Sequence, residues 1–182
     1  MKIIRTKLDG CFIVEPKTFI DYRGAFLESY HKDRFLETTG LDIDFVQDNL
    51  SFSKKGVLRG LHFQAGEFAQ AKLIRVVKGE ILDVIVDLRK ESPTYGEFVK
   101  LRMVGKENRS IFIPKGMAHG FLALSDDVVF TYKCDSYYNP EAEAGIAFND
   151  PVLGIDWEYP KEDMILSEKD KNLPSFKSLN ND

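Results

Sequence analysis

The sequence predicts an all-β fold, a sandwich or jelly-roll barrel, formed by a single domain over residues 1–182. Short apolar runs alternate with turn residues along the chain, which is typical of antiparallel strands. Roughly ten such runs occur, a number that suits two packed sheets. The chain has 182 residues, 43% of them hydrophobic, which is enough to bury the core of one domain.

The predicted strands are rich in apolar, β-branched and aromatic residues. In chain order they cover residues 11–15, 25–30, 45–51, 57–64, 72–77, 81–88, 98–104, 110–113, 120–124 and 128–134. Turn residues at Gly79, Asn108 and Gly116 separate several of these strands.

A few short helices are predicted outside the strands. Residues 31–38 form a helix that stops at Gly40, a residue suited to the left-handed position after a helix. A second helix begins near Ser167, because its hydroxyl and the carboxylate of Asp170 resemble a capping box with aspartate in place of glutamate. Residues 158–182 are polar and are expected to pack on the domain as a C-terminal segment.

Composition excludes several classes of function. The chain has 25 basic and 29 acidic residues, so its net charge of −4 argues against nucleic acid or an anionic membrane as the main partner. No apolar run approaches the roughly 18–20 residues that span a bilayer. The start has no signal-peptide pattern, and Cys11 and Cys134 stand far apart, so a cytoplasmic location and no structural zinc are expected. Glycine-rich nucleotide loops are also absent.

The predicted strand at residues 81–88 has an unusual polar side chain. On one face of this strand every side chain is apolar, whereas the other face includes Asp83 and Asp87. Carboxylates are rarely buried without a partner. Asp83 is therefore expected either to line a polar cavity or to be a structural carboxylate bonded to the backbone.

Two histidines, His62 and His119, lie in or next to separate predicted strands, which suggests a cupin-type barrel. The residues from Pro114 to His119 are similar to the second cupin motif. The first motif of metal-binding cupins usually contains two histidines, but here it reads His62-Phe63-Gln64, so no metal is expected. A histidine without a metal is suited to act as a general base.

Four other polar side chains each have a functional and a structural interpretation. Tyr132, on the last predicted strand, is either a catalytic acid or a packed core aromatic. Arg23, Arg59 and Lys72 either hold an anionic substrate or are solvated surface charges.

A series of motifs, in a fixed order, covers nearly the whole chain. They are Phe19-x-Asp21-x-Arg23-Gly24-x-Phe26-x-Glu28-x-Tyr30, Phe45-Val46-Gln47-Asp48-Asn49, Val57-Leu58-Arg59-Gly60-Leu61-His62-Phe63-Gln64, Gln70-Ala71-Lys72-Leu73, Gly79-Glu80-x-x-Asp83-Val84-x-Val86-Asp87-Leu88-Arg89, Ile113-Pro114-x-Gly116-x-Ala118-His119-Gly120-Phe121, Tyr132-Lys133, Gly154-Ile155-Asp156-Trp157 and Leu166-Ser167-x-Lys169-Asp170. Together they resemble the dTDP-4-dehydrorhamnose 3,5-epimerase family. The chain departs from the family at Ala71, where glycine is common.

The resemblance implies a cupin-type jelly roll, a homodimer, and no metal or organic cofactor. It also implies that dTDP-4-keto-6-deoxy-D-glucose is inverted at C3 and C5 to give dTDP-4-keto-L-rhamnose for rhamnose biosynthesis. The C4 ketone acidifies the hydrogens on both carbons, because each carbanion is delocalised as an enolate. Such a reaction needs a base, an acid on the opposite face and a group that stabilises the enolate.

The family's functional residues carry over to matching positions of this chain. By resemblance, His62 is the base, Asp170 orients it, Tyr132 is the acid and Lys72 stabilises the enolate. The implied substrate-binding residues are Arg23 and Arg59 for the diphosphate, Glu28, Gln47, Asp48 and Asn49 for the nucleotide, Tyr138 for stacking on thymine, Glu143 and Lys169 for further contacts, and His119, which the resemblance places beside Lys72 to share the stabilisation of the enolate.

Strict alternation along a strand places Arg59 and His62 on opposite faces. Both reach one site only if the strand twists or bulges, and Gly60 is the predicted position of a bulge. The alternative is that Arg59 serves the pocket of another chain.

Three other functions stay open at this point. Relatives with the same histidine, aspartate and tyrosine act as mono-epimerases, inverting only C3 or only C5 of another dTDP-4-keto sugar. The chain could also be a metal-dependent cupin, or a binding module for sugar nucleotides without catalysis.

Overall fold

The computed structural model describes residues 1–180, so the last two residues of the predicted C-terminal segment lie outside the described residues. Strands dominate the structure. They are β1 (Lys2–Arg5), β2 (Phe12–Glu15), β3 (Thr18–Asp21), β4 (Gly24–Leu27), β5 (Gln47–Ser53), β6 (Leu58–Gln64), β7 (Lys72–Lys78), β8 (Glu80–Asp87), β9 (Phe98–Val104), β10 (Ser110–Ile113), β11 (Met117–Ala123), β12 (Val128–Cys134) and β13 (Glu143–Gly145).

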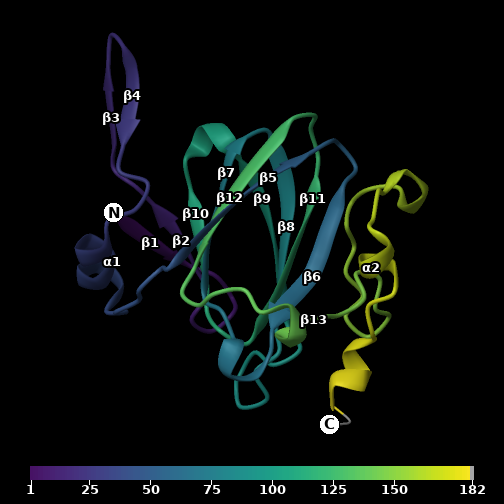
Figure 1. Ribbon diagram of the computed structural model, residues 1–182. Helices are drawn as coiled ribbons and strands as arrows, with labels where there is room; N and C mark the ends of the chain where they lie inside the picture. Colours follow the sequence, from purple (N-terminus) through teal and green to yellow (C-terminus); the bar gives the residue numbers. More distant parts are fainter. Residues whose placement is uncertain (181–182) are drawn as a thin grey trace.

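Helical elements are short and lie outside the sheets (Figure 1). They are the α-helices α1 (Lys32–Thr39) and α2 (Glu168–Lys171) and the 3-10 helices η1 (Gly66–Phe68), η2 (Gly105–Glu107), η3 (Pro140–Ala142), η4 (Lys161–Asp163) and η5 (Phe176–Asn180). As predicted, α1 ends at Gly40, whose φ of 75° is left-handed.

Two antiparallel sheets form the body of the molecule (Figure 1). The strand order is β1-β2-β10-β7-β12-β5 in the six-stranded sheet and β13-β6-β11-β8-β9 in the five-stranded sheet. Strands distant in sequence are thus neighbours, as in β2–β10 and β6–β13. The predicted jelly roll is confirmed.

The predicted strands are found with shifted ends, and three strands were missed. β1, β3 and β13 have no strong apolar pattern of their own and depend on pairing with β2, β4 and β6. The prediction of a strand at residues 25–30 was wrong in extent, because β4 pairs only with the four residues of β3 and ends at Leu27. His119 lies within β11, not in a turn before it.

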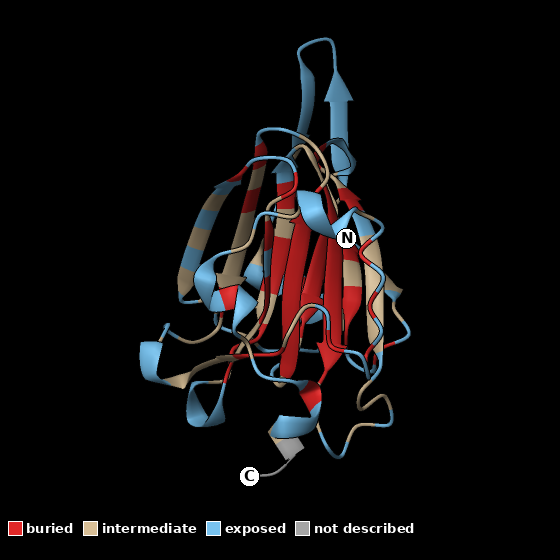
Figure 2. Cartoon of the chain, turned by 90° about the vertical axis from the view of Figure 1, so that its right-hand side faces the viewer, coloured by how far each residue is buried: buried red, intermediate tan, exposed pale blue. Residues whose placement is uncertain are grey.

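β8 contributes to two apolar clusters, one on each of its faces. Buried residues concentrate in the strands at the middle of the molecule (Figure 2). Ile81 and Ile85 face the barrel interior, whereas Val84 and Val86 pack in a second cluster with Trp157 and other residues of the C-terminal half. Full burial of such a side chain stabilises the fold by about 1.5–3 kcal/mol. The face of this strand that was predicted to be apolar therefore does pack in a core.

The C-terminal segment is hydrogen-bonded to the rest of the domain at two places, first at the barrel and then at the loop after β13. Near its start, the Ile165 N–H donates to Gly56 O at 2.8 Å, and the Leu58 N–H donates to Ile165 O at 3.0 Å. Near its end, the Phe176 N–H donates to the buried carboxylate of Asp150 at 2.8 Å. α2 is held between these two attachments and contacts β6.

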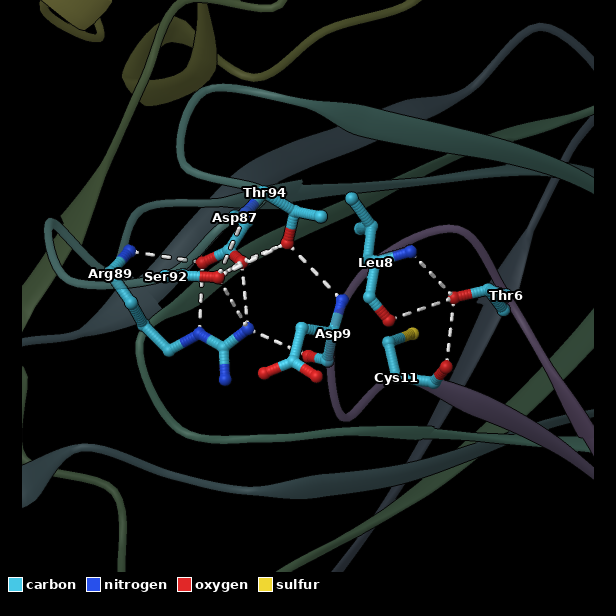
Figure 3. Close-up of polar contacts among 8 residues, drawn as sticks. All are labelled: Thr6, Leu8, Asp9, Cys11, Asp87, Arg89, Ser92 and Thr94. Carbon is cyan, nitrogen blue, oxygen red and sulfur yellow. Dashed lines mark hydrogen bonds and ion pairs between the residues drawn. The ribbon is translucent and has the colours of Figure 1, made fainter.

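A buried ionic network around Asp87 ties two loops together (Figure 3). Arg89 donates to Asp87 Oδ1 at 2.9 Å through Nε and to Oδ2 at 2.7 Å through Nη2, and the Ser92 and Thr94 hydroxyls donate to Oδ2. Arg89 Nη2 also donates to Asp9 O at 2.7 Å. The loop at residues 6–11 is thereby joined to the loop at residues 89–94.

The β3–β4 hairpin projects away from the barrel (Figure 1). Its side chains are largely exposed, including Ile20 at 81% and the turn residue Tyr22 at 97%. Among residues 1–180, no helix is long and apolar enough to cross a membrane.

Candidate active site

A cavity of about 560 Å³ opens between the two sheets beside the C-terminal segment. Its lining residues come from β5, β6, β7, β11, β12 and the C-terminal segment: Ser51, Val57, Leu58, Arg59, His62, Lys72, His119, Phe121, Phe130, Tyr132, Ile165, Leu166, Ser167, Lys169 and Asp170. All four residues predicted to be catalytic line this single cavity. Three predicted binding residues, Arg59, His119 and Lys169, do so as well.

His62 and Asp170 form a close pair. His62 Nε2 lies 2.5 Å from Asp170 Oδ1, and the side chains are 28% and 6% exposed, respectively. Burial tends to raise the pKa of Asp170, but hydrogen bonds from His62, Ser167 and the Gly60 N–H outweigh it, so the net shift is downward. An ionised carboxylate on one ring nitrogen orients the imidazole and leaves the other nitrogen for a proton from substrate.

A second histidine–aspartate pair lies next to the first, on the neighbouring strand of the same sheet. His119 Nε2 is 2.7 Å from Oδ1 of the fully buried Asp83, and the ring of His119 stacks on Phe130. His119 is also the direct register partner of His62 across β6 and β11. Asp83 does not line the cavity, so the first expectation was wrong. It is a buried carboxylate, as the second expectation held, but its bond is to a side chain and not to the backbone.

The predicted bulge at Gly60 is present. His119 pairs with His62 and Phe121 pairs with Arg59, so β6 uses one residue more than β11 over this stretch. The extra residue turns both Arg59 and His62 toward the cavity. Arg59 is held by hydrogen bonds to Ser53 Oγ at 3.1 Å and Phe52 O at 3.2 Å.

Lys72 and Tyr132 lie opposite the histidines, on the six-stranded sheet. Lys72 Nζ is 6.0 Å from the centre of the Tyr132 ring. Burial lowers the pKa of Lys72, because the ammonium loses solvation, and burial raises the pKa of Tyr132, because the phenolate loses it. Tyr132 therefore keeps its proton, as an acid must before it acts.

A connected set of side chains from several elements includes more of the predicted binding residues. The Tyr138 hydroxyl donates to Glu143 Oε2 at 2.5 Å, and Lys169 forms an ion pair with the same oxygen. Burial raises the pKa of Glu143, but Lys169 and Tyr138 outweigh it and the net shift is downward. Gln47 accepts from the Tyr138 N–H at 2.9 Å and donates to Asn49 at 3.0 Å.

Three predicted binding residues lie elsewhere. Arg23 is on the projecting hairpin and pairs with Asp21 at 2.6 Å. Glu28 follows β4 and pairs with an arginine of α1. Asp48 does not line the catalytic cavity but a smaller one, where it pairs with Lys133 at 2.8 Å. A single chain therefore does not bring these residues to its own catalytic cavity.

The sequence did not identify every residue at the site. Ser51 lines the cavity, and strand alternation from Asn49 was the available signal. Ser167 was recognised only as a helix cap, and Asp83 only as an unusual carboxylate. No cluster of three or more metal-ligating side chains occurs within residues 1–180.

Comparisons with known proteins agree with this geometry. A family model described as dTDP-4-dehydrorhamnose 3,5-epimerase matches residues 5–178. The dTDP-4-dehydrorhamnose 3,5-epimerase of Methanothermobacter thermautotrophicus is 52% identical over 172 residues, covering 94% of this chain and 92% of that protein.

Solved structures are also similar. The dTDP-4-dehydrorhamnose 3,5-epimerase of Elizabethkingia anophelis matches with a TM-score of 0.95 and 50% identity, covering 99% of this chain and 98% of the other. The Legionella pneumophila dTDP-6-deoxy-D-glucose-3,5-epimerase, solved in complex with dTDP-4-keto-L-rhamnose, matches with a TM-score of 0.92 and 46% identity over 97% of this chain and 93% of the other. The chain therefore belongs to the dTDP-4-dehydrorhamnose 3,5-epimerase family, as its motifs predicted.

Proposed function

We propose that this chain inverts C3 and C5 of dTDP-4-keto-6-deoxy-D-glucose, giving dTDP-4-keto-L-rhamnose, through His62, Asp170, Tyr132 and Lys72. One observation carries this assignment: His62 on one sheet, Tyr132 and the half-buried Lys72 on the facing sheet, and Asp170 on α2 all line the same cavity. Binding alone would need no base and acid on opposite sides.

Each inversion is then a pair of proton transfers. The free nitrogen of His62 takes the proton from carbon, and the electron pair of the broken C–H bond moves into the enolate, placing negative charge on the C4 oxygen. Lys72 stabilises that charge in a site of low dielectric. Tyr132 donates its proton to the opposite face of the same carbon. Exchange with water then returns a proton to Tyr132 and removes one from His62.

We also propose that the active form is a homodimer in which the hairpin of one copy reaches the cavity of the other. The hairpin exposes large apolar side chains, and so does β5, with Leu50 at 59% and Phe52 at 68%. Apolar exposure on this scale marks interaction surfaces. A partner's hairpin would also bring Arg23 to the substrate, where its forked donors suit a diphosphate.

The experiment that tests the reaction follows deuterium by NMR. Metal-stripped protein is incubated with dTDP-4-keto-6-deoxy-D-glucose in heavy water. We expect deuterium at both C3 and C5 and the rhamno product, and no exchange with His62→Ala, which should still bind dTDP. Exchange by His62→Ala at the normal rate would contradict the base assignment.

A mono-epimerase is the second candidate, because it needs the same base and acid. Deuterium at only one carbon would identify it. Exchange that appears only after a divalent metal is added back would instead indicate a metal-dependent cupin.

A further inference from the structure

We propose that Gln64 is a positioning residue for the nucleobase end of the substrate, because it fixes the loop that presents the ring of Tyr138 beside the cavity. The inference rests on the proposed function, since the substrate named there carries one flat aromatic ring, the thymine. Gln64 itself is assigned no contact with the substrate.

The side chain of Gln64 holds a loop and does not line the catalytic cavity. Gln64 is buried, and its Oε1 accepts the Asn139 N–H at 2.8 Å. Asn139 belongs to residues 135–142, the loop between β12 and β13. The position that usually holds the second histidine of the first motif in metal-binding cupins is therefore used in this chain to anchor a loop.

Two hydrogen bonds fix Tyr138 directly, and the bond to Gln64 fixes the residue after it. The Tyr138 N–H donates to Gln47 Oε1 at 2.9 Å, and its hydroxyl donates to Glu143 Oε2 at 2.5 Å. The side chain is nevertheless 50% exposed. The neighbouring Tyr137 is more exposed and is hydrogen-bonded to no other residue within 1–180. The loop thus immobilises one of its two tyrosines in particular.

The three acceptors come from both sheets. Gln47 begins β5 of the six-stranded sheet, whereas Gln64 and Glu143 are direct register partners on β6 and β13 of the five-stranded sheet. Glu143 also forms an ion pair with Lys169, which lines the catalytic cavity. Tyr138 is therefore held at the edge of the cavity, between its two walls.

An aromatic ring that is exposed and already immobilised is suited to stack on another flat ring. Ordering a side chain on binding opposes affinity, so a ring that is fixed beforehand binds its ligand more tightly. When the sugar lies in the cavity, the thymine is the part of the substrate that could cover such a ring outside it. Gln64 then contributes to nucleotide affinity, whereas the base and the acid act on the sugar without it.

The test is Gln64→Met, which removes the acceptor and keeps a side chain of similar length and volume in the buried position. We expect the Kd for dTDP and the KM to rise by about 3- to 10-fold, because Tyr138 must then be ordered on binding. The value of kcat and the rate of deuterium exchange at saturation should stay nearly unchanged. Isothermal titration calorimetry with dTDP and steady-state kinetics measure the two effects.

The matched control is Gln70→Met. Gln70 is also buried, and its Nε2 donates to Ser136 O at 2.7 Å, so it holds the same loop two residues before Tyr138. Its loss should leave the Kd for dTDP nearly unchanged. If both variants weakened binding equally, the general stability of the loop would set the affinity, and the specific role of Gln64 would be wrong.

A double-mutant cycle shows whether Gln64 acts through Tyr138. Tyr138→Leu removes the exposed ring, so adding Gln64→Met to it should weaken dTDP binding far less than Gln64→Met does alone. Additive losses, an unchanged Kd for Gln64→Met, or a fall in kcat at constant KM would each overturn the inference. If the unmodified chain neither bound dTDP nor exchanged protons, it would be the proposed function that failed, so the two failures are distinguishable.

Discussion

Lys72 shows how burial shifts the pH range over which a side chain is charged. A lysine is cationic below its pKa, and burial lowers the pKa of Lys72. The charge that stabilises the enolate is therefore lost, as pH rises, sooner than an exposed lysine would lose it. The pKa of Tyr132 shifts upward, so the phenol stays protonated over the same range.

We therefore expect kcat to fall at alkaline pH because Lys72 loses its proton there. Lys72→Arg keeps a cation at high pH, so its remaining activity should persist further into the alkaline range, although the longer side chain lowers kcat at neutral pH. Profiles of kcat against pH for the two forms check this. If kcat falls over the same alkaline pH range in both forms, the fall is caused by the ionisation of another group.

Single residues were predictable where chemistry restricts their number. With only three histidines in the chain, His62 and His119 could be proposed as functional from their strands. Their partners could not be paired by spacing, because Asp170 lies 108 residues from His62. The resemblance supplied that pairing, and only the position of β8 beside β11 in the same sheet paired Asp83 with His119.

Among the elements, β6 contains the glycine with the least space around it. A Cβ on Gly60 would overlap Gly120 Cα and stand 2.9 Å from His119 O, at a φ of +127°. Gly24, in the hairpin, has nearly the same φ of +128° but nothing within 4 Å. Substitutions at these two glycines therefore distinguish the cost of a strained backbone conformation from the cost of steric overlap.

Gly60→Ala should destabilise the fold by about 1–3 kcal/mol more than Gly24→Ala, because only the first forces β6 and β11 apart. Urea unfolding of the two variants checks the difference. Equal losses would mean that backbone conformation, not close approach of the strands, requires glycine at the bulge.

Elements with their own apolar pattern were predictable, and elements that depend on a neighbour were not. β8 was found from sequence because Leu82, Val84 and Val86 form an apolar face and two isoleucines alternate with the aspartates on the other face. β13, with the sequence Glu-Ala-Gly, is extended because it pairs with β6 across 79 residues of chain, from Gln64 to Glu143. The bulge in β6 was found because two functional residues on one strand had to share a face.

At the scale of the whole molecule, the proposed dimer makes a prediction about mixed subunits. Arg23→Ala disables the hairpin of one chain, and His62→Ala disables the base of the other. If the hairpin acts on its partner, mixing these two inactive variants restores one complete site in each mixed dimer, or about a quarter of full activity after random exchange.

The measurement is activity after the two variants are co-refolded, with molar mass determined in parallel by light scattering. Each variant refolded alone should stay inactive and dimeric. No recovery from a sample that contains mixed dimers would mean that each hairpin serves its own chain, or none. The sequence could suggest a dimer by resemblance, but not which copy receives Arg23, since that depends on the direction in which the hairpin leaves the barrel.

The network around Asp87 has a consequence for the behaviour of the molecule in acid. Burial would raise the pKa of Asp87, but its bonds to Arg89, Ser92 and Thr94 outweigh burial and lower the pKa from 3.8 to about 2. A lowered pKa stabilises the folded state fully above the ordinary carboxyl value, and this stabilisation is lost only as pH falls toward 2. The tie between the loops at residues 6–11 and 89–94 is thus kept in mild acid, after exposed carboxylates have lost their charge.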